Sequence, residues 1–149
     1  MRKEKLQAAT LGGTADEVEA AFYEALAKGD LERLVACWAD EDDIVCIHPG
    51  GGRLVGIGAI RASFEALFAN SAINATPLSV RKVESLASSM HNVIERIELK
   101  TPEGLRHGYV IATNVYLKTA QGWRMAVHHA SPGTIDEARL AEAPAQMLH

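Results

Sequence analysis

Residues 90–131 read MHNVIERIELKTPEGLRHGYVIATNVYLKTAQGWRMAVHHAS, and this stretch decides the fold. Its segments rich in β-branched and aromatic residues cover 90–99, 105–117 and 123–131. Between them, residues 101–104 (TPEG) place Pro and Gly where a tight turn needs them, and residues 121–122 (QG) mark a second turn. The stretch therefore predicts three long antiparallel strands joined as a meander.

The residues before this meander predict helices. Thr14 followed by Glu17 forms a capping box, apolar residues then recur at helical spacing, and Gly29 ends the helix. Asp30 caps a second helix, whose apolar stripe runs to Trp38. A third helix is expected after residue 56, and residues 135–142 are expected to form a loose terminal helix.

Short extended segments connect the helices to the meander. Residues 44–47 form an apolar strand, residues 48–52 (HPGGG) must turn, and residues 53–55 return. A further strand is expected over 78–86. Helices gathered ahead of a meander predict an α+β domain in which a strongly bent, mostly antiparallel sheet packs on three helices and encloses a pocket.

The length and composition of the chain limit its domain organisation and its possible partners. The chain has 149 residues, which suits one domain over 14–132, with a mobile arm over 1–13 and a tail over 133–149. Its net charge is -4 and it has no basic run, which argues against nucleic acid. The absence of a long apolar run predicts no membrane contact, and we expect a cytoplasmic protein.

The sequence indicates neither a metal nor a cofactor. The adjacent acids over 40–43 point apart and suit a solvated loop. The glycines at 50–52 lack the spacing and the Lys of a phosphate-binding loop. Cys37 and Cys46 lie in apolar patterns whose spacing fits neither zinc nor redox chemistry, so we expect buried free thiols.

Two motifs carry a resemblance to a known family. Residues 38–56 read W-x-D-E-D-D-I-V-C-I-H-P-G-G-G-R-L-V-G ahead of a helix, and residues 122–132 read GWRMAVHHASP. Together they resemble the SnoaL-like members of the nuclear-transport-factor-2-like superfamily, over roughly residues 14–132. The resemblance implies a cone-shaped fold. It leaves activity open, because the superfamily includes isomerases, dehydratases, polyketide cyclases and non-enzymatic assembly domains.

His48 is the first candidate catalytic residue. Ketosteroid isomerases, which the chain resembles, hold their proton-shuttling Asp at the end of the first strand, just before a Pro, and His48 occupies that place. An imidazole with a pKa of about 6.5 suits a general base, although His48 could instead brace the turn. Phe22 stands where these relatives carry a Tyr, so their oxyanion donor does not carry over.

The last strand supplies a second cluster. Alternation places Trp123, Met125, Val127, His129 and Ser131 on one face and His128 on the other, exposed or at a subunit contact. If Lys118 pairs with Trp123 and Lys100 with Leu105, the polar residues of the first face lie close together. These residues are His129, Asn114, Ser131, His91 and Glu95.

This face has two readings. It could line a site with His129 and Asn114 in catalytic roles, or hold a satisfied polar pair in a half-buried sheet. Phe22 and Trp38 are core residues that could also line the pocket floor. The expected ligand is a small apolar or carbonyl-bearing molecule, for isomerisation, cyclisation or dehydration; the alternative is a non-catalytic binding or assembly domain.

The opposite face of strand 105–117 predicts self-association. Tyr109, Ile111, Val115 and Leu117 lie on it and are too apolar to face water. A homodimer that uses the same patch of both subunits would cover them.

Overall fold

Six strands form a single open sheet in the computed structural model, which describes residues 13–142. The sheet order is β2-β1-β6-β5-β4-β3. The elements, in chain order, are α2 (Ala15–Lys28), α3 (Leu31–Ala36), β1 (Val45–Ile47), β2 (Leu54–Val55), α4 (Ile57–Asn70), β3 (Ala75–Glu84), β4 (Ser88–Thr101), β5 (Gly104–Thr119), β6 (Gly122–Pro132) and α5 (Ile135–Glu142).

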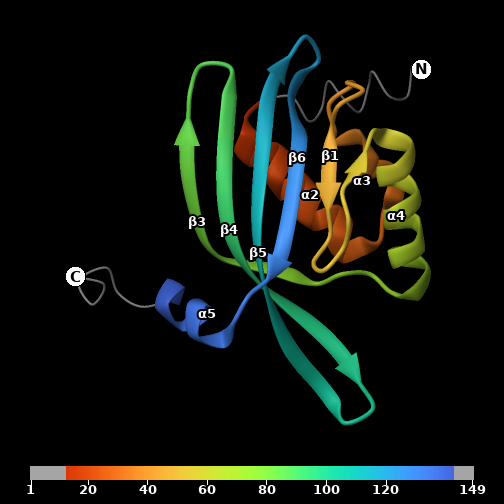
Figure 1. Cartoon of the computed structure of the whole chain (residues 1–149), viewed down its shortest axis with the longest axis vertical. Helices are drawn as coiled ribbons and strands as arrows, with labels where there is room; N and C mark the ends of the chain where they lie inside the picture. Colours follow the sequence, from red (N-terminus) through yellow and green to blue (C-terminus); the bar gives the residue numbers. More distant parts are fainter. Residues whose placement is uncertain (1–12, 143–149) are drawn as a thin grey trace.

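The predicted α+β architecture is confirmed. Strands β3 to β6 pair in antiparallel fashion, and only β1 and β6 run parallel among the described strand pairs. Helix α2 crosses one face of the bent sheet with α3 and α4 beside it, and the β4–β5 hairpin extends beyond the body of the domain (Figure 1). We call the face toward α2 the inner face.

Local signals explain where the helices begin and end. Thr14 caps α2 by accepting a hydrogen bond from the backbone N–H of Glu17 at 3.1 Å, and Gly29 ends the helix with a φ of 63°. The second helix is shorter than its apolar stripe predicts. Residues 37–39 instead pair with β6, where Ala39 and Met125 share a 2.8 Å backbone hydrogen bond, so Trp38 lies outside the helix.

The core lies between α2 and the inner face. Val18, Phe22 and Leu26 of α2 pack there with Phe64 of α4 and Met125 of β6. Cys37 and Cys46 are free and buried, as expected, and burial raises the pKa of each thiol to about 12.

The predicted strand pairings hold at both turns but fail further along β6. Lys100 pairs with Leu105 and Lys118 with Trp123. A bulge then follows, because Tyr116 pairs with Met125 but Val115 pairs with Val127, which leaves Ala126 as the extra residue. Past this bulge the two faces of β6 are exchanged relative to the prediction.

Strand β3 and the ends of the chain each add a finding. Strand β3 begins at Ala75, earlier than predicted, because a bulge next to Pro77 lets this edge strand accommodate a residue without a backbone N–H. The terminal helix is present as α5, whereas residues 1–12 and 143–149, and with them most of the predicted arm, lie outside the described residues. No helix within 13–142 is long and apolar enough to cross a membrane.

Candidate functional site

A row of polar side chains crosses the inner face of five strands. Cross-strand pairing aligns Cys46 of β1 with His128, His128 with Asn114, Asn114 with His91, and His91 with Lys82 of β3. Residues that pair directly across strands point to the same face. This inner row therefore brings two imidazoles, an amide and an ammonium group under α2, where the core would otherwise be apolar.

His128 and Asn114 form a buried hydrogen-bonded pair. His128 Nδ1 lies 2.6 Å from Asn114 Oδ1, and an amide oxygen only accepts, so Nδ1 donates and the lone pair of the neutral ring is on Nε2. The ring packs against Phe22 at 5.1 Å between centroids. Burial lowers the pKa of His128 to about 3, with the neighbouring His48 and His129 adding to the effect. His128 is therefore neutral at physiological pH.

Glu19 of α2 joins two strands through one oxygen atom. Its Oε2 accepts hydrogen bonds from His91 Nδ1 and from the hydroxyl of Tyr116, each at 2.7 Å. His91 and Tyr116 are both fully buried. These two hydrogen bonds tie α2 to β4 and β5, and the first of them fixes the orientation of the His91 ring.

Tyr23 and Glu95 form a second buried pair one helical turn further along α2. The Tyr23 hydroxyl donates to Glu95 Oε2. Burial raises the pKa of Glu95 to about 7, against a smaller lowering by this hydrogen bond, and the nearby Glu19 raises it further. Burial, and then the charge of Glu95, also raise the pKa of Tyr23. Near neutral pH this site can therefore hold or release a proton.

His48 follows β1 and turns toward α4. Its Nε2 lies 2.9 Å from Ser63 Oγ, whose own proton is donated to the Ile60 carbonyl at 2.7 Å. Ser63 must therefore accept from His48 Nε2–H, which leaves the lone pair on Nδ1. The half-buried ring packs edge-on against Phe64 at 4.9 Å, and burial lowers the pKa of His48.

A pocket of about 220 Å³ opens at the start of α2, where the helix meets the β3–β4 turn. Its lining residues are Thr14, Ala15, Asp16, Glu84, Ser85, Ser89 and Trp123. Trp123 gives it an apolar wall, and Ser89 contributes a buried hydroxyl that has no hydrogen-bond partner among the described residues. His91 lies one inner-face position beyond Ser89 on β4.

The structure separates the polar residues of β4, β5 and β6 that the sequence placed together on one face. Asn114, His91 and Glu95 lie on the inner face as predicted, with exposures of 0%, 0% and 4%. The placement of His129 and Ser131 beside them is wrong, because the bulge at Ala126 turns both to the opposite, exposed side. The same bulge buries His128, which the alternation placed outside.

The two aromatic candidates are core residues. Phe22 is fully buried, with its ring against Phe64 and His128. Trp38 is 5% exposed and bridges to Met125. Neither lines the pocket at the start of α2.

Sequence patterns did not point to Glu19, Tyr23 or Tyr116. A signal for Glu19 was present, because it follows Ala15 by four residues and precedes Phe22 by three, which places a charge within the buried stripe of α2. A charged residue at such a position needs buried partners. Tyr23 lies four residues further on, on the same side of the helix.

Comparison with known proteins supports the fold described above. The SnoaL-like domain profile matches residues 16–135. A candidate calcium/calmodulin-dependent protein kinase type II association domain from Thiobacillus denitrificans is 31% identical, with a TM-score of 0.73 over 83% of this chain and 98% of that one. A candidate dehydratase of the NTF2-like family from Streptomyces avermitilis is 30% identical, with a TM-score of 0.71 over 78% and 92%.

A more distant structure shows the fold alone. It is an uncharacterised protein with a cystatin-like fold from Caulobacter vibrioides, 15% identical, with a TM-score of 0.69 over 84% of this chain and 91% of that one. No protein of curated function matches the sequence. The profile match spans most of the chain, and the chain therefore belongs to the SnoaL-like family of the nuclear-transport-factor-2-like superfamily.

Proposed function

We propose that this protein binds a small carbonyl-bearing or polycyclic molecule and removes a proton from it, as an isomerase, cyclase or dehydratase, with His48 as the general base. The observation that carries the proposal is the hydrogen bond from His48 Nε2 to Ser63. A base needs one ring nitrogen fixed by a partner and the other free to accept a proton. Ser63 takes this fixing role for His48.

The surroundings of His48 support this role. Burial disfavours its charged form, so the ring is neutral at pH 7 and ready to accept a proton. Phe64 packs edge-on against it, and the buried rings of Phe22 and His128 continue the core behind Phe64.

The likeness to the Streptomyces avermitilis protein, named as a candidate dehydratase, favours the same chemistry. Loss of water next to a carbonyl begins with abstraction of an α-proton, the step assigned here to His48. No cofactor enters this scheme, because an imidazole can perform the step by itself. We expect the protein to act in the cytoplasm.

Proton exchange in D₂O tests the proposal. β-Tetralone, a fused bicyclic ketone with acidic α-hydrogens, serves as the probe, and NMR follows replacement of those hydrogens by deuterium. Removal of a general base typically lowers a rate by about 10²–10⁴. His48→Ala should show such a loss, and His48→Asp should restore part of it by rebuilding the relatives' carboxylate.

His129→Ala serves as the matched control, because it removes an exposed imidazole from the opposite face and should leave exchange unchanged. Catalysed exchange that is equally fast in His48→Ala would sink the assignment. Exchange no faster than in buffer, with β-tetralone and with larger polycyclic ketones, would favour the second function below.

A second candidate function is assembly. An apolar row crosses all six strands on the outer face, formed by Val55, Val45, Val127, Val115, Met90 and Val83. Val83, Val55 and Met90 are 66%, 44% and 40% exposed. The 31% identical relative is named an association domain. We propose that two copies pair through this outer row and the neighbouring Ile111 and Leu117.

A further inference from the structure

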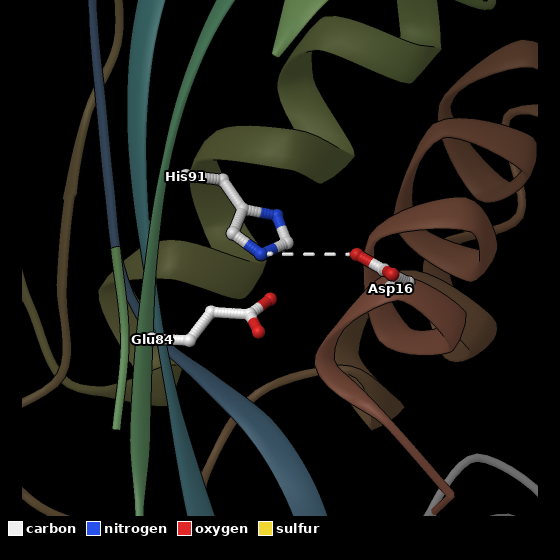
Figure 2. Close-up of side chains that lie close together, drawn as sticks. All are labelled: Asp16, Glu84 and His91. Carbon is white, nitrogen blue, oxygen red and sulfur yellow. Dashed lines mark ion pairs between the residues drawn. The ribbon is translucent and has the colours of Figure 1, made fainter. Parts of the chain in front are cut away.

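Three ionisable side chains from separate elements meet beside the start of α2, and two of them, Asp16 and Glu84, line the pocket there. Asp16 comes from the first turn of α2, Glu84 from the end of β3 and His91 from β4. One ligand atom of each lies within 4.8 Å of the others. Figure 2 shows the His91 ring edge facing the Asp16 carboxylate, with the Glu84 carboxylate directed into the same space.

The burial of His91 and its unpartnered ring nitrogen distinguish this cluster from a group of surface acids. Its side chain is 0% exposed, and Nδ1 donates to Glu19 at 2.7 Å, which leaves Nε2 as the nitrogen that faces the cluster. Nε2 has no hydrogen-bond partner among the described residues. Its distance of 3.8 Å to Asp16 Oδ1 is too long for a hydrogen bond. A buried ring nitrogen without a hydrogen-bond partner, placed beside two carboxylates, is a position that a bound cation would satisfy.

We propose that His91 Nε2, Asp16 and Glu84 bind a divalent transition-metal ion of the first row, such as zinc. Two donor atoms about 2.1 Å from a tetrahedral ion lie about 3.4 Å apart, so the 3.8 Å separation of His91 and Asp16 needs little adjustment. Asp16 is 61% exposed and Glu84 is exposed, so both carboxylates can move to complete the site. An imidazole ligand favours this class of ion over magnesium or calcium, which take oxygen ligands.

Glu19 supports the proposed metal ligand His91 by bonding to its other ring nitrogen. A ligating histidine almost always donates its other ring N–H to a carboxylate or carbonyl, which fixes the ring and raises its basicity. Glu19 accepts that proton and is itself held by Tyr116. The pocket of about 220 Å³, with Ser89 in its wall, leaves space on the metal for water or an anionic ligand group.

The Lys82 ammonium group pairs with one of the proposed metal ligands, Asp16, and so competes with the metal ion. Its Nζ lies 2.7 Å from Asp16 Oδ1, and it neighbours His91 across the β3–β4 pair. The ammonium group supplies positive charge to Asp16 but cannot reproduce coordination by the buried nitrogen of His91. A metal ion would displace it, and the 37% exposed lysine side chain can turn into solvent.

The test titrates Zn²⁺ and Co²⁺ into the full chain after dialysis against a chelator, with calorimetry and the Co²⁺ absorption spectrum as readouts. We expect one ion per chain. Asp16→Asn and Glu84→Gln should each weaken binding about tenfold or more, since loss of even an outer partner costs 10–100-fold. Glu17→Gln, which removes an exposed acid next to Asp16 in the same turn, should bind as the unaltered chain does.

Lys82→Gln separates ligation from a mere attraction to negative charge. Because it removes a competing ammonium without touching a ligand, it should tighten binding severalfold and leave the Co²⁺ spectrum unchanged. Absence of saturable binding would overturn the proposal. So would binding that Asp16→Asn and Glu84→Gln leave intact, because the ion would then lie elsewhere. The result does not depend on the His48 assignment, whose probe reaction uses no metal.

Discussion

Burial acts in opposite directions on two residues of the inner face. It raises the pKa of Glu95 to about 7 and lowers that of His128 to about 3. In both cases the neutral form is favoured, because a charge in this low-dielectric region is costly. Near pH 7 His128 is therefore neutral, whereas Glu95 is divided between its neutral and charged forms.

Replacement of Glu95 by Gln tests its raised pKa. A group whose pKa is raised by folding contributes stability below its unfolded pKa, and this contribution is lost as pH rises through the folded pKa. Gln cannot ionise and can still accept the Tyr23 hydrogen bond. Between pH 4 and 8, urea unfolding should show the free energy of unfolding of the unaltered protein falling by on the order of 3 kcal/mol relative to that of Glu95→Gln. Parallel pH profiles would show that Glu95 titrates normally.

At the scale of elements, turn chemistry made strand pairing predictable near the turns. Residues 101–104 and 121–122 fix the pairings of Lys100 with Leu105 and of Lys118 with Trp123. The bulge at Ala126 could not be predicted, because neither Gly nor Pro marks it and both registers bury apolar residues. That one extra residue decides which of two adjacent histidines lies in the interior.

The candidate site was predictable only in part for a related reason. His91, Glu95 and Asn114 follow from alternation along strands paired at a recognisable turn. Their partners on α2 depend on how the helix packs across the sheet, which a period of 3.6 residues does not specify. The approach of Asp16 to Glu84 likewise links residues far apart in sequence, and no local pattern encodes it.

The neighbouring histidines of β6 provide a direct test of register. His128→Ala removes a buried ring and leaves Asn114 Oδ1 without its donor, so it should cost about 2–4 kcal/mol of unfolding free energy. His129→Ala removes an exposed ring and should stay within about 0.5 kcal/mol. Denaturant unfolding at pH 7.5 measures both. Equal costs, or a larger cost for His129, would mean that the bulge is misplaced.

At the scale of the molecule, the two faces of the sheet have different characters. The inner face carries the polar row beneath α2, and the outer face carries the apolar row that contains Val115. The His48 site and the Asp16–Glu84–His91 cluster lie near opposite ends of the inner row, on β1 and on β3–β4. They can therefore be altered independently of each other and of the outer face.

Self-association should depend on the centre of the outer row. Val115→Lys places a charge in its middle, and because Val115 is half-buried on an outward-facing position, the subunit should still fold. Light scattering should give twice the 16.0 kDa chain mass for the unaltered protein and a single chain mass for the variant. Leu86→Lys, at a 96% exposed site in the β3–β4 turn, should leave the mass unchanged. A monomer at micromolar concentration would rule out this surface as an interface.

The protonation state of His48 tests the central claim most directly, and it requires no substrate. Long-range ¹⁵N NMR of histidine-labelled protein distinguishes the two ring nitrogens, with the His48 signal assigned by its loss in His48→Gln. At pH 7.5 we expect a neutral ring with its proton on Nε2, facing Ser63, and an unprotonated Nδ1. The signal should titrate below the ordinary histidine pKa of about 6.5, because burial opposes its charge. A proton on Nδ1, or a charged ring at pH 7.5, would contradict the account, because His48 would then have no free basic nitrogen.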